Sequence, residues 1–243
     1  FWRAPTDNDF GNRMGILCNV WRTAGQNKEF KGMNVERKDG AVTLTSIYYL
    51  RDVASDYTVK YTVYADGRVE VNGSWKAGNI ALPEIPRFGM QMTLAQEFDQ
   101  FSWYGRGPWE NYSDRNTASF IGKYTSTVDE QYVAYIRPQE NGNKTDVRWL
   151  TLTNKEGFGL RIDGLQPLSV SALRNYPEDF DAGLTKSQRH INDINPRKAV
   201  VLHVDLAQRG VGGDNSWGMY PHEPYLLKAK EYTYGYVISP VVK

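Results

Sequence analysis

The chain has 243 residues, of which 40% are hydrophobic and 23% are charged, so it is long and apolar enough to bury a substantial core. Lysines and arginines number 29 against 28 aspartates and glutamates, which leaves no net field to attract nucleic acid or an acidic membrane surface. The apolar stretches fall far short of the ~20 residues that span a bilayer. A soluble protein with neither a nucleic acid nor a membrane as partner is expected.

Cys18 is the single cysteine, which excludes an internal disulfide and a cysteine metal cluster and favours a reducing compartment. The chain opens at Phe1, within what reads as a motif already in progress, so the lack of a targeting signal carries no weight. Aromatic residues make up 13% of the chain, a level that suits both the core of a β-sandwich and contacts with sugars. Only rings in polar loops therefore suggest a function.

Strand patterns follow one another along the chain. The clearest lies at residues 58–72, where Val59, Tyr61 and Val63 alternate with polar residues and Asp66-Gly67 predicts a hairpin turn. Helical periodicity is weak, and residues 12–21 and 176–191 are the best candidates for short helices. Further β-rich runs are residues 41–50, 88–94, 147–153, 160–163, 168–173, 200–206 and 232–238. Short strands separated by glycine and proline predict an all-β, antiparallel sandwich, and residues 1–243 are expected to form one domain.

Four polar segments interrupt the strands, namely residues 3–9, 104–115, 137–142 and 210–217. Each concentrates glycine, aromatic and charged or amide residues more densely than a plain loop needs. A structural interpretation stays open for every residue in them, because Asp and Asn beside Gly or Pro satisfy loop backbone groups and a trapped arginine pairs with a carboxylate.

Together these segments resemble the carboxy-terminal small-chain domain of bacterial β-galactosidases of glycoside hydrolase family 2. Residues 3–11 follow that family's RAP-x-DND-x-G pattern, and residues 21–25 follow W-x-x-AG. YG-x-GP-x-ENY-x-DR, P-x-ENG and G-x-GGD-x-SW then match residues 104–115, 138–142 and 210–217. The resemblance covers almost the whole chain. It implies a large antiparallel supersandwich similar to galactose mutarotase, within a parent enzyme that removes terminal, non-reducing β-D-galactose from β-galactosides such as lactose.

The same resemblance limits what this chain does alone. A retaining glycosidase uses two carboxyl groups about 5 Å apart, carried on a (β/α)₈ barrel of about 250 residues. No barrel pattern is present here, so the catalytic glutamates are expected upstream and none in this chain. Its partners would be the upstream barrel and sandwich domains and the β-galactoside. Magnesium or calcium and sodium sites, if the parent has them, are expected outside this chain, and an oligomeric parent in the bacterial cytoplasm or periplasm is compatible with the resemblance.

One contribution to the sugar pocket does map onto this chain. In the family, the tryptophan of G-x-GGD-x-SW reaches the barrel, and here it is Trp217. An indole beside the apolar C–H face of galactose removes that face from water. Gly210, Gly212 and Gly213 are expected to permit the bends that project the ring. The alternative is a tryptophan that plugs the edge of the sandwich.

Other motif residues are expected to support this loop from below through hydrogen bonds. A calcium ion held by their carboxylates is an alternative, but the spacing fits no known calcium loop, so no metal site is predicted. The support residues are Asp7, Asn8, Asp9, Glu110, Asn111, Asp114, Arg115, Asp214 and Ser216.

The 3 histidines matter because mutarotases use a histidine and a glutamate as acid and base. His203 lies in a strand-like run and is expected to be structural, whereas His190 and His222 lie in polar segments. His222, which follows Trp217 closely, is the candidate for a contact at the rim of the pocket. Three functions therefore compete: a noncatalytic domain that completes a β-galactosidase, a free-standing aldose 1-epimerase, and a carbohydrate-binding module.

Overall fold

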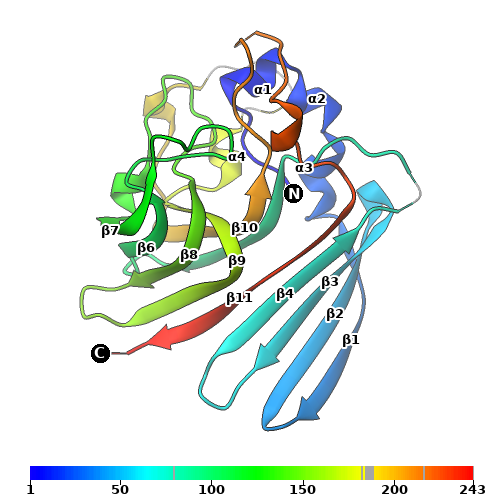
Figure 1. The fold of residues 1–243 in the computed structure, drawn as a ribbon, viewed down its shortest axis with the longest axis vertical. Coiled ribbons are helices and arrows are strands. Elements are labelled where there is room, and N and C mark those ends of the chain that lie inside the picture. The colour runs from blue at the N-terminus through cyan, green and yellow to red at the C-terminus, as the bar shows by residue number, and fades with distance from the viewer. Residues whose placement is uncertain (79, 182, 184–188, 216, 243) are drawn as a thin grey trace.

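The structure is a computed structural model that describes residues 1–78, 80–181, 183, 189–215 and 217–242. Its strands form an antiparallel 11-stranded sheet in the order β1-β2-β3-β4-β11-β9-β8-β6-β7, with β10 joining β9 to β5 (Figure 1). The all-β, antiparallel fold predicted from the sequence is confirmed. The strands are β1 (Lys28–Lys38), β2 (Ala41–Leu50), β3 (Ser55–Val63), β4 (Val69–Lys76), β5 (Arg87–Ala95), β6 (Gln100–Gly107), β7 (Phe120–Thr127), β8 (Lys144–Thr153), β9 (Gly159–Leu173), β10 (Ala199–Gln208) and β11 (Glu231–Val241).

The helices are short and gather at one end of the molecule, around the start of the chain (Figure 1). They are α1 (Asp7–Gly11), α2 (Met14–Leu17), α3 (Val20–Ala24) and α4 (Pro177–Phe180), with 3₁₀ turns η1 (Arg51–Val53), η2 (Asp129–Gln131), η3 (Ile191–Asp193) and η4 (Glu223–Tyr225). Among the residues that the structure describes, no helix is both long and apolar enough to cross a membrane.

Strand β9 connects the two parts of the sheet. Its first half pairs with β11 from Gly159 to Gly164, and its last residues, Ser169 to Leu173, pair with β10. The sequence suggests two separate strands here, whereas the structure joins them through residues 164–167. Gly164 permits this passage, because a Cβ there would lie 2.9 Å from the side chain of Leu168 and would overlap the carbonyl of Gln166.

Strand residues form most of the core, and the short helices at the start of the chain add to it at one end. Trp21 of α3, Trp75 of β4 and Phe88 of β5 are almost completely buried and pack against one another, with the Trp21 and Trp75 ring centroids 5.4 Å apart. In β6, Phe101 and Trp103 point to the same face and stack at 4.9 Å, because alternate residues of a strand share a face. Most of the aromatic content thus serves packing.

Both helices predicted from periodicity are wrong as continuous elements. Residues 12–21 contain α2 and the start of α3, interrupted after Leu17. In the second region the helix ends at Phe180, since Asp181 has an extended backbone and Gly183 has a φ of 85° that favours glycine. The remainder of residues 176–191 holds only η3 at its end, apart from 182 and 184–188, which lie outside the described residues.

Candidate functional site

The glycine-rich motif near the end of the chain forms a long connection between β10 and β11, and in Figure 1 it passes beside α1 at the end of the molecule that carries the helices. We call residues 209–222 the site loop. Contacts that tie it to the first residues of the chain include Arg209 to Asp9, Asn8 to the carbonyl of Val211, and Asn12 to the carbonyl of Met219. The loop is therefore fixed by residues that lie about as far away in sequence as the chain allows.

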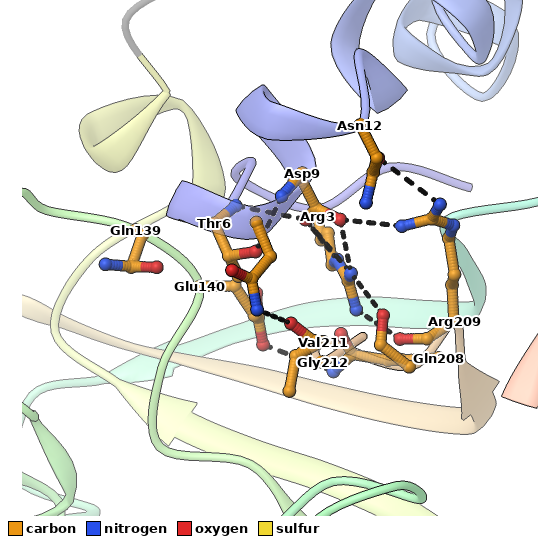
Figure 2. A network of polar contacts seen from close by, with 12 residues as sticks. Arg3, Thr6, Asp9, Asn12, Gln139, Glu140, Gln208, Arg209, Val211 and Gly212 are labelled. Atoms are coloured by element: carbon orange, nitrogen blue, oxygen red, sulfur yellow. Dashed lines mark hydrogen bonds and ion pairs between the residues drawn. The ribbon is translucent and has the colours of Figure 1, made fainter. Parts of the chain in front are cut away.

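The base of the site loop is a buried ion cluster (Figure 2). Asp9 accepts from Arg3, with Nη2 to Oδ1 at 2.9 Å, and from Arg209, with Nη1 to Oδ1 at 2.8 Å. All three side chains are fully buried. Burial by itself lowers the pKa of Arg3, but the neighbouring carboxylate of Asp9 outweighs it and holds that pKa above its ordinary value. The guanidinium group of Arg3 therefore stays charged beneath the loop.

Arg3 also contacts the loop backbone directly. Its Nη2 donates to the carbonyl of Gly210 at 2.9 Å, and its Nη1 donates to the carbonyl of Arg209. Asp9 is placed by the start of α1, where it forms a capping box with Thr6: the Thr6 hydroxyl accepts from the Asp9 amide, and the Asp9 carboxylate accepts from the Thr6 amide. The helix cap and the loop base thus share one carboxylate.

A second carboxylate holds the loop from the opposite side. Asp114 accepts from the amide of Gly212 through Oδ2 at 2.7 Å. A Cβ at Gly210 would lie only 2.5 Å from that same oxygen, and one at Gly213 would lie 2.8 Å from the carbonyl of Met219. None of the three predicted glycines, Gly210, Gly212 and Gly213, has a left-handed φ. The sequence-based reason for them was therefore wrong: they allow close approach by neighbouring groups instead of unusual bends.

Trp217 lies exposed at the tip of this loop. Its side chain is 78% exposed, and those of Met219 and Tyr220 beside it are also exposed. The Asn215 side chain shapes the tip, because Oδ1 accepts from the amides of Trp217 at 3.1 Å and Met219 at 3.3 Å. The indole is thus accessible to solvent on a loop that is fixed at its base.

Two further predicted residues form a pair on the loop. His222 Nε2 lies 2.8 Å from Asp214 Oδ1, and both side chains are largely exposed. Contact with Asp214 orients the imidazole and leaves Nδ1 available, which suits a hydrogen bond to a hydroxyl-rich ligand. Ser216, also predicted to support the loop, lies outside the described residues.

The other predicted support residues contact segments below the loop. Glu110 accepts from Arg115 at 2.6 Å and from the amide of Gly142 at 2.8 Å, and Asn111 accepts from the amide of Thr145 at 2.8 Å. These bonds join two of the polar segments, residues 104–115 and 137–142, to each other and to the start of β8. Asp7 similarly accepts from Gln139 and Arg137. Of the predicted set, Asn8, Asp9, Asp114 and Asp214 are the residues that touch the loop or anchor it.

Sequence reasoning missed the two arginines at the centre of the cluster. Arg3 stands in the first motif and Arg209 directly precedes the last one, yet neither was chosen as a support residue. The available signal was chemical, since a carboxylate buried next to a helix start needs a cation. No periodicity could have paired them, because Asp9 and Arg209 are 200 residues apart.

The third histidine lies away from the loop, in the interior. His203 of β10 is buried, and its Nδ1 lies 3.2 Å from Nη1 of Arg87. Burial, reinforced by the charge of Arg87, holds the pKa of His203 well below its usual value, so the imidazole is neutral. Across the described residues, we find no cluster of three or more His, Cys, Asp or Glu side chains that could hold a metal ion.

Comparison with known proteins adds to this geometry. The family model described as "Beta galactosidase small chain" matches residues 1–238. The chain belongs to this family. Sequence relatives named beta-galactosidase include one from Priestia megaterium, 38% identical over 99% of this chain, and one from Streptococcus thermophilus, 32% identical over 99% of it. The small chain spans only 23% of the length of each. The resemblance inferred from the motifs is confirmed.

Solved structures similar to the small chain are more distant. A GH36 alpha-galactosidase from Geobacillus stearothermophilus, AgaA A355E, matches with a TM-score of 0.46 and 11% identity over 88% of this chain and 28% of its own. A GalM/aldose epimerase homologue from C. elegans matches with a TM-score of 0.41 and 12% identity over 86% of this chain and 68% of its own.

Proposed function

We propose that the small chain completes the sugar pocket of a β-galactosidase and contributes Trp217 as one wall of it, while the bond is broken by another part of the enzyme. The observation that carries this proposal is the exposed indole on a loop fixed by buried charges at its base. Galactose has an apolar face of C–H groups, and an indole is the side chain best suited to cover it. The curated relatives extend far beyond the region matched here, which leaves room for a separate catalytic domain.

The finer features of the proposal follow from the family resemblance. The substrate is a terminal, non-reducing β-D-galactose, the reaction is a retaining hydrolysis of glycoside hydrolase family 2 type, and the partner is an upstream (β/α)₈ barrel that carries both carboxyl groups. His222, oriented by Asp214, would donate or accept a hydrogen bond at the rim. Magnesium, calcium or sodium sites of the enzyme would lie outside this chain, and the complete enzyme would be compatible with an oligomer.

The test is replacement of Trp217 by alanine in the complete enzyme. Losing the stacking surface should lower kcat/KM for a nitrophenyl β-galactoside by about tenfold or more, with Trp217→Phe intermediate. Thermal unfolding should be unchanged, because the indole is exposed. Trp109→Ala is the matched control: it removes an indole that is 75% exposed in a different polar segment. Wild-type kinetics for Trp217→Ala, or an equal loss for the control, would remove Trp217 from the pocket.

A second measurement separates the competing functions. The 243-residue chain and the remaining part of the enzyme are assayed apart and then mixed. We expect β-galactoside hydrolysis only in the mixture, because a lone stacking residue on half a pocket gives poor affinity and no catalysis. Epimerase turnover by the small chain alone would favour the mutarotase alternative. Tight galactose binding by the small chain alone would favour a carbohydrate-binding module.

A further inference from the structure

The sheet formed by β1 to β4 has one apolar face that continues beyond the core. Strand register places Val35, Leu44 and Tyr61 in one row with Val71, and places Val42 and Val63 in the next row with Val69. Directly paired residues of an antiparallel sheet point to the same side. Val71 is fully buried in the core, so the same face runs without interruption from the interior to the edge strand. We call Met33, Val35, Val42, Leu44, Tyr61 and Val63 the outer apolar face.

This face is uncovered at its far end. Met33 is 54% exposed and Val35 48%, and Tyr61 and Val63 are each 38% exposed. Within the described residues, the hydrophobic core cluster extends across β3 and β4 to Val59 and Val69 but does not include the outer apolar face. Figure 1 shows the reason: the ends of β1 to β4 project past the other strands. β5 and β10 are joined to the sheet through β9, on the other side of β11 from β1 to β4.

The opposite face of the same strands is mostly polar, with Ile47 and Tyr49 of β2 as exceptions. Asn34 and Glu36 alternate with the apolar residues of β1, and Thr43, Thr45, Lys60 and Thr62 alternate with those of β2 and β3. A sheet with water on both sides has no need of this alternation at its outer end, since alternation is the pattern of a sheet with one covered face. The alternation in β1 to β3 therefore indicates that the apolar side of these strands is covered by a partner.

The edge of the sheet at β1 is poorly suited to pairing with another strand. β1 is the edge strand, it carries Lys28, Lys31 and Lys38, and its register shifts between Phe30 and Gly32. Lysines and bulges at an edge strand oppose strand addition. A partner would thus pack against the face of the sheet and not extend its edge.

We propose that the outer apolar face is a docking surface for another domain of the same, longer polypeptide. The length of the relatives indicates this partner. The beta-galactosidases from Priestia megaterium and Streptococcus thermophilus match 99% of this chain, but the chain covers only 23% of their length, so most of such a polypeptide lies outside it. Arg37 lies at the outer end of the face, in register with Val42, and has none of the ion pairs found among the described residues. A complementary domain would bring an apolar surface with a carboxylate opposite Arg37.

The test uses the complete protein and two double variants of β1 with the same change of charge. Met33→Lys with Val35→Lys alters the outer apolar face, and Asn34→Lys with Glu36→Gln alters the polar face of the same strand. Limited proteolysis should release the small chain at least about tenfold faster from the first variant, because lysines at a dry interface lose their hydration. The second variant should behave like the wild type. Val35→Thr, which keeps the branched shape, should accelerate release by only a few-fold.

Two results would overturn the proposal. One is equal release from all variants, since that would mean that nothing in the polypeptide covers the face. The other is a change in the oligomeric state, measured by sedimentation, without faster release, which would assign the face to contacts between copies of the protein. Because the altered side chains are half exposed in the small chain itself, the substitutions leave its own core intact.

Discussion

At the scale of single residues, the shape of the site loop depends on one carboxylate. Asp9 is the anion shared by two buried arginines, and it also caps α1. Breaking a buried ion pair leaves charge without compensation, which costs more than the pair itself contributes. The loop that carries Trp217 is therefore sensitive to a residue that no ligand would touch.

Replacing Asp9 by asparagine tests this dependence. We expect the free energy of unfolding, measured by urea denaturation, to fall by about 3–5 kcal/mol, because Arg3 and Arg209 remain buried without a counter-charge. Asp7→Asn in the same helix is the control, since its side chain is 59% exposed and the expected change is within about 0.5 kcal/mol. Equal effects of the two substitutions would mean that the cluster contributes little.

Lys144 offers a pH-dependent test away from the loop. Burial lowers the pKa of Lys144 to about 8, although nearby Glu110 opposes the shift, and Nζ donates to the carbonyl of Gly142 at 3.1 Å. An unfolded lysine titrates near pH 10.4. Between about pH 8 and pH 10.4 the unfolded chain holds a proton that the folded chain has lost, so raising the pH through this window favours the folded state.

The comparison is with Lys144→Met, which keeps the length of the side chain and cannot titrate. From pH 8 to pH 10 the wild type should gain about 1–3 kcal/mol of unfolding free energy relative to this variant. Denaturant titrations at several pH values measure the difference. Curves that stay parallel over this range would show that Lys144 keeps its proton in the folded state.

At the scale of elements, the sequence predicts strands with a clean alternation and misses those where alternation breaks. Residues 41–50 were predicted to the residue as β2, and the Asp66-Gly67 turn joins β3 and β4 as expected. β1 was missed because its register shift separates Phe30 from Met33 by three positions, which destroys the period of two. β6 was partly absorbed into a polar motif, and β7 lies at the other edge, where polar residues suit solvent.

In the candidate site, too, some residues could be predicted from the sequence and others could not. The motif pattern was sufficient to choose Trp217, Asp114 and the loop itself, because those residues lie within short conspicuous segments. The buried cluster was not predictable, since its members come from opposite ends of the chain and meet only when the sheet is complete. Local sequence patterns predict local structure, whereas a contact between residues 200 positions apart depends on the topology of the whole fold.

At the scale of the whole molecule, the last strand closes the fold. β11 pairs with β4 from Glu231 to Ile238 and with β9 from Tyr236 to Val241. It thus lies in the middle of the sheet, with β1 to β4 on one side and β9, β8, β6 and β7 on the other. In Figure 1 it runs diagonally across the centre of the molecule.

Truncation after Lys230 should therefore prevent cooperative folding, because β4 and β9 would both lose their partner and Tyr234 and Tyr236 would leave the core. Circular dichroism during heating should show no sharp transition. Truncation after Val241 is the control and should shift Tm by no more than about 2 °C, since Val242 is exposed. A sharp transition in the longer truncation would show that the hairpins fold without β11.

The contacts between the start of the chain and the site loop also limit how this chain can be recombined with its relatives. A designer who exchanged residues 209–222 between relatives would disturb the ion pair between Arg209 and Asp9 and the hydrogen bond from Arg3 to the carbonyl of Gly210. The transplanted loop would then lack the contacts that fix its base. A viable graft has to carry the opening dozen residues along with it. The shape of this loop thus depends jointly on two distant stretches of sequence.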